Sequence, residues 1–139
     1  MIRRFVPFAL LIVAMPVFAQ VSVVVTIPTI DPGLPFEIAV AVQNLSGADL
    51  KGLTSVVEIP PGARVAGLPS TCTESGQTVT CLIADLPYVL SLPQKTFGIT
   101  AIADDSTNGT VLPISVDVRG PTGTPLTNQT IDAKVYRTI

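Results

Sequence analysis

The 139-residue sequence contains no histidine and no tryptophan, and only two cysteines and two tyrosines. Histidine is the commonest general base and metal ligand in proteins, so its absence removes the usual starting point for both chemistries. No serine stands in a G-x-S-x-G nucleophile elbow. Asp104 and Asp105 are adjacent carboxylates, but neighbours in a turn point apart. We therefore predict a non-catalytic protein without a cofactor.

Charge is also scarce, since Asp, Glu, Lys and Arg together make up 13% of the residues. Eight basic and ten acidic residues give a formal net charge of −2. The basic residues form no cluster, and a weakly acidic surface repels a phosphate backbone. We predict that nucleic acid is not a partner.

Long apolar runs are lacking except at the beginning of the chain. Arg3 and Arg4 precede an uncharged apolar stretch at residues 5–18, and Val-Phe-Ala then supplies small or apolar residues before Gln20. The stretch is short for a membrane span, and two prolines interrupt it. The pattern therefore predicts a cleaved secretory signal.

We predict a signal peptide at residues 1–19, followed by one domain at residues 20–139 without a membrane span. Cleavage would remove two of the eight basic residues and no acidic residue, which changes the formal charge from −2 to −4. No cysteine lies directly after the cut, so a lipid anchor is not expected. The predicted location is secreted, periplasmic or cell-surface.

Short alternating segments dominate the rest of the chain. Phe36, Ile38, Val40 and Val42 share one face of residues 35–44, and this period of two is typical of a strand with one buried side. Thirteen prolines and ten glycines separate the apolar runs. The further strands are expected at residues 21–27, 53–59, 64–68, 78–83, 96–103, 111–119 and 131–136. We predict an all-β, immunoglobulin-like Greek-key sandwich of about seven or eight strands.

Two connections also carry expectations. Residues 85–93 are bounded by prolines, and we predict a crossing loop with buried leucines there. Asn108-Gly109 lies between two alternating segments and predicts a hairpin.

Cys72 and Cys81 flank Ser-Gly-Gln, a natural turn between two short arms. In an exported chain this spacing predicts a disulfide that closes a β-hairpin. Two sulfurs without histidine make a poor zinc site.

Candidate ligand-binding residues are few. Tyr88 and Tyr136 are the aromatic residues expected outside the core, and Tyr136 can equally be an ordinary cross-strand partner. Asp104, Asp105 and Asn108 form the segment richest in oxygen ligands and are weak calcium candidates, because Ca²⁺ takes six or more oxygens. Asn44, Asn108 and Asn128 stand in Asn-x-Ser/Thr triplets, which are glycosylation sites only if the source makes N-glycans.

The order of these segments resembles a bacterial cell-surface repeat, the domain of unknown function eleven, present here as a single copy. The resemblance covers roughly residues 31–119. It rests on the strand at 36–44, the Pro-x-Gly end of 56–62, Cys72, the segment 78–82 with Cys81, and the strand at 97–103. It implies an immunoglobulin-like surface module without catalytic residues.

Together these features predict an exported, non-catalytic structural or protein-interaction module of the bacterial envelope or extracellular space. Its partners would be other envelope or extracellular proteins. The alternative is a small secreted protein that binds carbohydrate or calcium through the tyrosines or the segment 104–108.

Overall fold

The computed structural model describes residues 21–87 and 94–138. The predicted signal peptide, Tyr88 and most of the predicted crossing loop lie outside these ranges. The described residues form nine strands and one 3-10 turn: β1 (Val21–Thr26), β2 (Pro35–Asn44), β3 (Leu50–Glu58), β4 (Ala63–Gly67), β5 (Cys72–Ser75), β6 (Thr78–Leu86), β7 (Gln94–Ala103), η3 (Asp105–Thr107), β8 (Val111–Arg119) and β9 (Pro125–Lys134).

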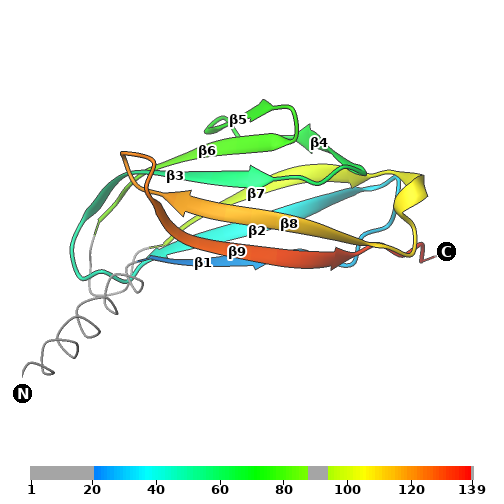
Figure 1. Cartoon of the computed structure of the whole chain (residues 1–139), viewed down its shortest axis with the longest axis horizontal. Coiled ribbons are helices and arrows are strands. Elements are labelled where there is room, and N and C mark those ends of the chain that lie inside the picture. The colour runs from blue at the N-terminus through cyan, green and yellow to red at the C-terminus, as the bar shows by residue number, and fades with distance from the viewer. Residues whose placement is uncertain (1–20, 88–93, 139) are drawn as a thin grey trace, which may run out of the picture.

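The strands form two stacked antiparallel sheets (Figure 1). One sheet has the order β1-β2-β7-β4 and the other the order β5-β6-β3-β8-β9. If the β5–β6 hairpin is set aside, this is the A-B-E-D and C-F-G arrangement of the immunoglobulin fold. The prediction of an immunoglobulin-like Greek-key sandwich is confirmed, and the first arm of the cysteine hairpin adds a ninth short strand.

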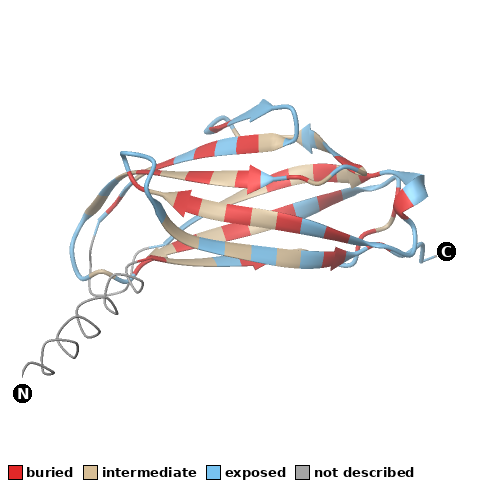
Figure 2. Cartoon of the chain, in the orientation of Figure 1, coloured by how far each residue is buried: buried red, intermediate tan, exposed pale blue. Residues whose placement is uncertain are grey.

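Buried and exposed residues alternate along the strands, as Figure 2 shows for the five-stranded sheet. The four residues predicted to face inward from β2 are all buried. They belong to the same core cluster as the aliphatic inner face of β8, which consists of Leu112, Ile114, Val116 and Val118. The two edges formed by β1 and β9 also meet, because Val25 N donates to Gln129 Oε1 over 3.2 Å. A single aliphatic core therefore lies between the sheets.

Strand β6 is longer than predicted, and this corrects the loop expected from residue 85. The strand continues through Asp85 to Leu86, which is buried. Ala84 takes a left-handed φ of 64° beside a register irregularity between β3 and β6. Inward residues of β6 are two positions apart as far as Ile83, but the irregularity places Leu86 three positions after Ile83. The period of two therefore ends before the strand ends. Leu86 does confirm a buried leucine in that region.

The hairpin predicted at Asn108-Gly109 is wrong. The flanking strands β7 and β8 lie in different sheets, since β7 pairs with β2 and β4 while β8 pairs with β3 and β9. The segment is therefore a crossover between sheets. It contains η3 at the end of the sandwich near the C-terminus (Figure 1).

Cys72 and Cys81 form the predicted disulfide, with an S–S distance of 2.06 Å. The two residues lie directly opposite each other on β5 and β6, and both are buried. The hairpin turn is held to the preceding connection, because Gln77 Nε2 donates to the carbonyl oxygens of Ile59 and Pro60. No helix in the described ranges is long and apolar enough to cross a membrane.

Candidate functional site

The outer face of the four-stranded sheet carries unusually small side chains at its centre. Ala39 and Ala41 project outward from β2, and Gly98 lies opposite Ala39 on β7. Strands favour β-branched and aromatic residues, which cover the pleated surface. Small residues on the two central strands therefore leave a depression in the middle of this face.

Larger side chains border this region and turn it into an open hollow of about 310 Å³. Val24 on β1 is 55% exposed and lies opposite Ala41, while Thr96 lies opposite Ala41 on the other side. The hollow is lined by residues of three neighbouring strands: Val24, Thr26, Glu37, Ala39, Val40, Ala41, Thr96, Phe97 and Gly98. We call this set the β2–β7 hollow. Its floor is mostly apolar and its border is polar.

Glu37 is the one charged residue in the lining. Its side chain lies over the backbone of Gly98, because a Cβ atom at position 98 would collide with the carboxylate and lie 2.8 Å from Glu37 Cδ. Glu37 is exposed, and its carboxylate makes no hydrogen bond or ion pair with any described residue. The hollow therefore combines an apolar floor with a carboxylate that has no protein partner.

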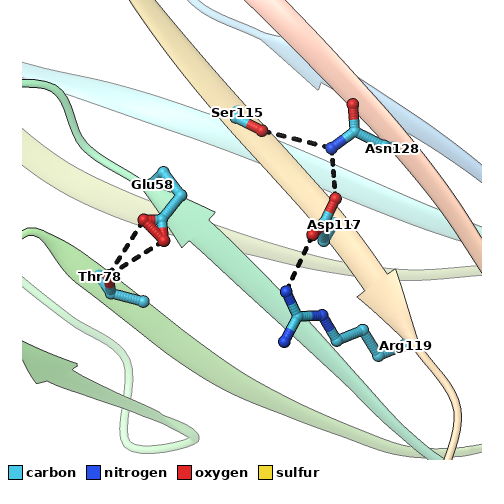
Figure 3. A network of polar contacts seen from close by, with 6 residues as sticks. All are labelled: Glu58, Thr78, Ser115, Asp117, Arg119 and Asn128. Atoms are coloured by element: carbon cyan, nitrogen blue, oxygen red, sulfur yellow. Dashed lines mark hydrogen bonds and ion pairs between the residues drawn. The ribbon is translucent and has the colours of Figure 1, made fainter. Parts of the chain in front are cut away.

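The outer face of the five-stranded sheet is different, because two of its carboxylates, those of Asp117 and Glu58, bind neighbouring polar side chains (Figure 3). Asp117 on β8 accepts hydrogen bonds from Arg119 Nη2, at 3.1 Å, and from Asn128 Nδ2 on β9. Asn128 Nδ2 also lies 3.3 Å from Ser115 Oγ. On β3, Glu58 accepts from Thr78 Oγ1 of β6, at 3.0 Å to each carboxylate oxygen. These carboxylates are already used by the protein.

The predicted calcium segment lies at the end of the sandwich, against the C-terminal residues. Asn108 Oδ1 accepts a hydrogen bond from Arg137 N at 2.9 Å, and Asp105 Oδ1 lies 3.4 Å from Arg137 Nη2. Asp104 holds the turn through its backbone, since its carbonyl oxygen accepts from Thr107 Oγ1 at 2.6 Å. In the described ranges no three His, Cys, Asp or Glu side chains gather as a metal site would require.

Asp31 joins the same end of the molecule to the C-terminal segment. Its carboxylate accepts from Thr138 Oγ1 at 2.7 Å and from Thr138 N at 2.9 Å. The side-chain hydrogen bond from Thr138 lowers the pKa of Asp31 below its ordinary value of 3.8, and the backbone hydrogen bond from Thr138 lowers this pKa further. This contact fastens the connection between β1 and β2 to the residues after β9.

Of the two predicted ligand-binding tyrosines, the structure describes Tyr136. Tyr136 follows β9 and is 48% exposed, and its backbone N donates to Ile30 O at 2.9 Å. Tyr88 lies outside the described residues, so the pair stays a prediction. Tyr136 does not line the β2–β7 hollow.

The three Asn-x-Ser/Thr asparagines all have structural contacts. Asn44 is fully buried, and its Nδ2 donates to Ala48 O and Leu86 O at 2.8 Å each. Both amide hydrogens of Asn44 are therefore used, which leaves no free group for a glycan. Asn108 and Asn128 are exposed and make the contacts described above.

The β2–β7 hollow lies on outward residues, so the inward residues that predict each strand give no sign of it. The outward residues of β2 contained a usable signal. Ala39 and Ala41 occupy outward positions where large or polar residues are common, and Gly98 interrupts an otherwise regular strand. What could not be read from the sequence is the register that places Gly98 beside Ala39 and beneath Glu37.

No protein-family model and no curated protein matches the chain. Solved structures share its fold. The major pilin subunit of Bacillus cereus is similar with a TM-score of 0.63 and 10% identity, over 86% of this chain and 41% of the pilin. A cohesin module of a Clostridium perfringens family 33 glycoside hydrolase has a TM-score of 0.60 and 14% identity, over 85% and 98%.

The chitin-binding domain of a Pyrococcus furiosus chitinase has a TM-score of 0.51 and 20% identity, over 76% of this chain and 96% of that domain. The chain thus spans about two fifths of the pilin and nearly all of the two smaller modules. These proteins have different roles on one architecture, so the likeness establishes the fold and leaves the function to the site.

Proposed function

We propose that this chain is a non-catalytic module that acts outside the cytoplasm and binds another envelope or extracellular protein through the outer face of its four-stranded sheet. The observation that carries the proposal is the β2–β7 hollow, where Ala39, Ala41 and Gly98 leave an apolar floor open to solvent. Apolar surface of this kind, bordered by polar residues, is typical of interaction sites.

The residue inventory supports a binding role rather than catalysis. The sequence has no histidine, and its two cysteines are bonded to each other. The carboxylates of Asp117 and Glu58 on the five-stranded face, and that of Asp31 at the end near the C-terminus, bind protein groups. The pilin and cohesin likenesses fit a structural or interaction module, as the resemblance to the surface repeat implied.

The disulfide supports a location outside the cytoplasm, because such bonds persist mainly in oxidising compartments. We propose that residues 1–19 act as a signal that is removed on export. N-terminal sequencing of the exported protein is expected to begin at Gln20, and a retained Met1 would contradict this part of the proposal.

The binding face is tested with two matched substitutions in the full chain, expressed with its own leader and crosslinked in intact cells. Ala41→Arg places a long charged side chain in the hollow. The control Thr80→Arg places the same side chain on the outer face of β6, in the other sheet. We expect a discrete crosslinked partner with the wild type and with Thr80→Arg, and its loss with Ala41→Arg. Loss with Thr80→Arg alone, or with neither, would contradict the assignment of the face.

Carbohydrate binding is the second candidate, and the exposed ring of Tyr136 is the observation in its favour. Exposed aromatic rings commonly stack on sugars, and the fold is shared with a chitin-binding domain. Saturable binding to a glycan array, lost with Tyr136→Ala and retained with Ala41→Arg, would favour this function. Calcium titration with Asp105→Ala tests the calcium alternative in the same way.

A further inference from the structure

Gly98 occupies a position where its backbone does not require glycine. It lies within β7, a central strand, and it is not among the glycines with positive φ. Glycine inside a strand weakens it, because the residue gains no side-chain packing and loses more backbone freedom on folding. Its effect here is to leave space for the carboxylate of Glu37, which a Cβ atom at position 98 would displace. Glycine in a strand often marks a place of close approach by another group.

The space holds a negative charge for which the described residues supply no counter-charge. The basic position nearest to it by register on this face is Arg64 of β4, which lies opposite Ile102, whereas Glu37 lies opposite Thr100. Neither ion pair found in the described residues includes Glu37. Lys95 is engaged elsewhere, since its Nζ donates to Ile83 O at 2.9 Å. The overall charge of the chain is also negative.

We propose that the β2–β7 hollow receives a lysine or arginine side chain from the partner protein, with Glu37 as its counter-charge. This inference rests on the proposed function and adds the chemistry of the partner. The aliphatic stem of such a side chain would cover Ala39, Ala41 and Gly98, while its cationic head would reach the carboxylate.

Charge complementarity selects this occupant. An acidic segment would meet the carboxylate and the net negative charge of the chain, and a purely apolar side chain would leave Glu37 desolvated without a partner. The surroundings of the hollow suit a protein surface, because Ser22, Gln43 and Gln94 continue the face as uncharged polar residues in one register row. Such a polar border is typical of protein–protein interfaces.

The inference is tested by NMR titration of the full exported chain with a capped pentapeptide, Ala-Thr-Arg-Thr-Ala, and with the same peptide carrying glutamine in place of arginine. We expect saturable shifts of the backbone amides of Ala39, Ala41 and Gly98 with the arginine peptide only. Glu37→Gln should lower the affinity about tenfold, which is the usual order for losing a charged hydrogen bond. Glu74→Gln is the matched control, because it removes an exposed carboxylate from β5.

Two variants that fill the hollow complete the test. Gly98→Ala displaces the carboxylate of Glu37. Ala39→Val fills the floor of the hollow with a residue that strands favour, so this variant should fold even if Gly98→Ala does not. We expect Ala39→Val to abolish the shifts produced by the arginine peptide. Equal binding of the glutamine peptide, an affinity for the arginine peptide that is unchanged by Glu37→Gln, or no shift at all would each overturn the inference. So would glucosamine oligomers that bind the hollow when the peptide does not.

The outcomes separate this inference from the proposed function. If cellular crosslinking depends on Ala41 but not on Glu37, the binding face stands and the cationic occupant is wrong. If crosslinking depends on neither residue, the binding face itself is wrong.

Discussion

The two outer faces of the sandwich differ in how they use their charged groups. On the five-stranded face, Asp117 binds Arg119 and Asn128, and Glu58 binds Thr78 across strands. On the four-stranded face, Glu37 lies over Gly98 without a protein partner, beside an apolar floor. Cross-strand pairs stabilise a sheet, whereas an unpaired group beside a hollow adds little to folding. The first face therefore contributes to stability, and the second is available for binding.

This difference shows that the core between the sheets does not determine how the outer face of each sheet is built. Both sheets contribute the same kind of inward aliphatic residues, such as Val40 from one and Val116 from the other. Their outward residues differ in size and pairing instead. Substitutions on opposite sides of one strand, and on the two outer faces, therefore test the comparison directly.

The largest effect is expected from exchanging an inward for an outward position on β2. Val40→Asp places a charge in the fully buried core without a partner and should prevent folding. Ala41→Asp, one residue along on the outer face, should fold. Circular dichroism and proton NMR distinguish a folded from an unfolded chain. A folded Val40→Asp protein would show that the faces of β2 are assigned the wrong way round.

The next largest effect concerns the disulfide at the free edge of the five-stranded sheet. Reduction should lower the free energy of unfolding by roughly 2–3 kcal/mol, because the bond closes a short loop in the unfolded chain. Chemical denaturation with and without a reductant measures the change. A Cys72→Ser, Cys81→Ser double variant should be insensitive to the reductant. An unchanged midpoint for the reduced wild-type protein would contradict a stabilising bridge.

A smaller effect separates the two outer faces. Asp117→Asn should lower the free energy of unfolding by up to about 1 kcal/mol, because it weakens the partly exposed ion pair with Arg119. Glu37→Gln should change it by less than about 0.5 kcal/mol, since Glu37 has no protein partner. Denaturant unfolding of both variants measures the difference. A larger loss from Glu37→Gln would show that this carboxylate serves folding, which would remove the main argument for the binding face.

The sequence was sufficient for the elements governed by local patterns. The period of two in β2 and the turn between the cysteines predicted the core face and the disulfide, because both depend on neighbours along the chain. The prediction failed where non-local pairing decided the outcome. Asn108-Gly109 indicated a hairpin, yet β7 and β8 pair with different sheets, and the irregularity at Ala84 concealed the end of β6.

The candidate site shows the same limit. The outward alanines of β2 are visible in the sequence, but their proximity to Gly98 follows from the pairing of two strands more than fifty residues apart, at the register Ala39 to Gly98. Likewise, the acidic segment suggested calcium from its composition alone. Its contacts with Arg137 depend on where the C-terminal segment lies, which no local pattern predicts.

The smallest effect is expected from a contact that belongs to neither face. Asp31 accepts two hydrogen bonds from Thr138, and its pKa is lowered in the folded protein. A lowered pKa means that the ionised form stabilises the fold at pH values above 3.8, the value for the free group, and that this contribution disappears as the pH falls through the folded pKa. Asp31→Asn should therefore lower the melting temperature slightly at neutral pH.

The difference between Asp31→Asn and the wild type should shrink as the pH is lowered, because the wild-type carboxylate then becomes protonated and also loses its charge. Thermal melts from pH 7 to pH 2 measure this convergence. Asp132→Asn is the matched control, since it removes an exposed carboxylate of β9 for which no hydrogen bond is found in the described ranges. A difference in melting temperature that stays constant across the pH range would mean that Asp31 acts through the shape of its side chain rather than through its charge. The contact with Thr138 would then not depend on electrostatics, unlike the charged contacts that distinguish the two faces.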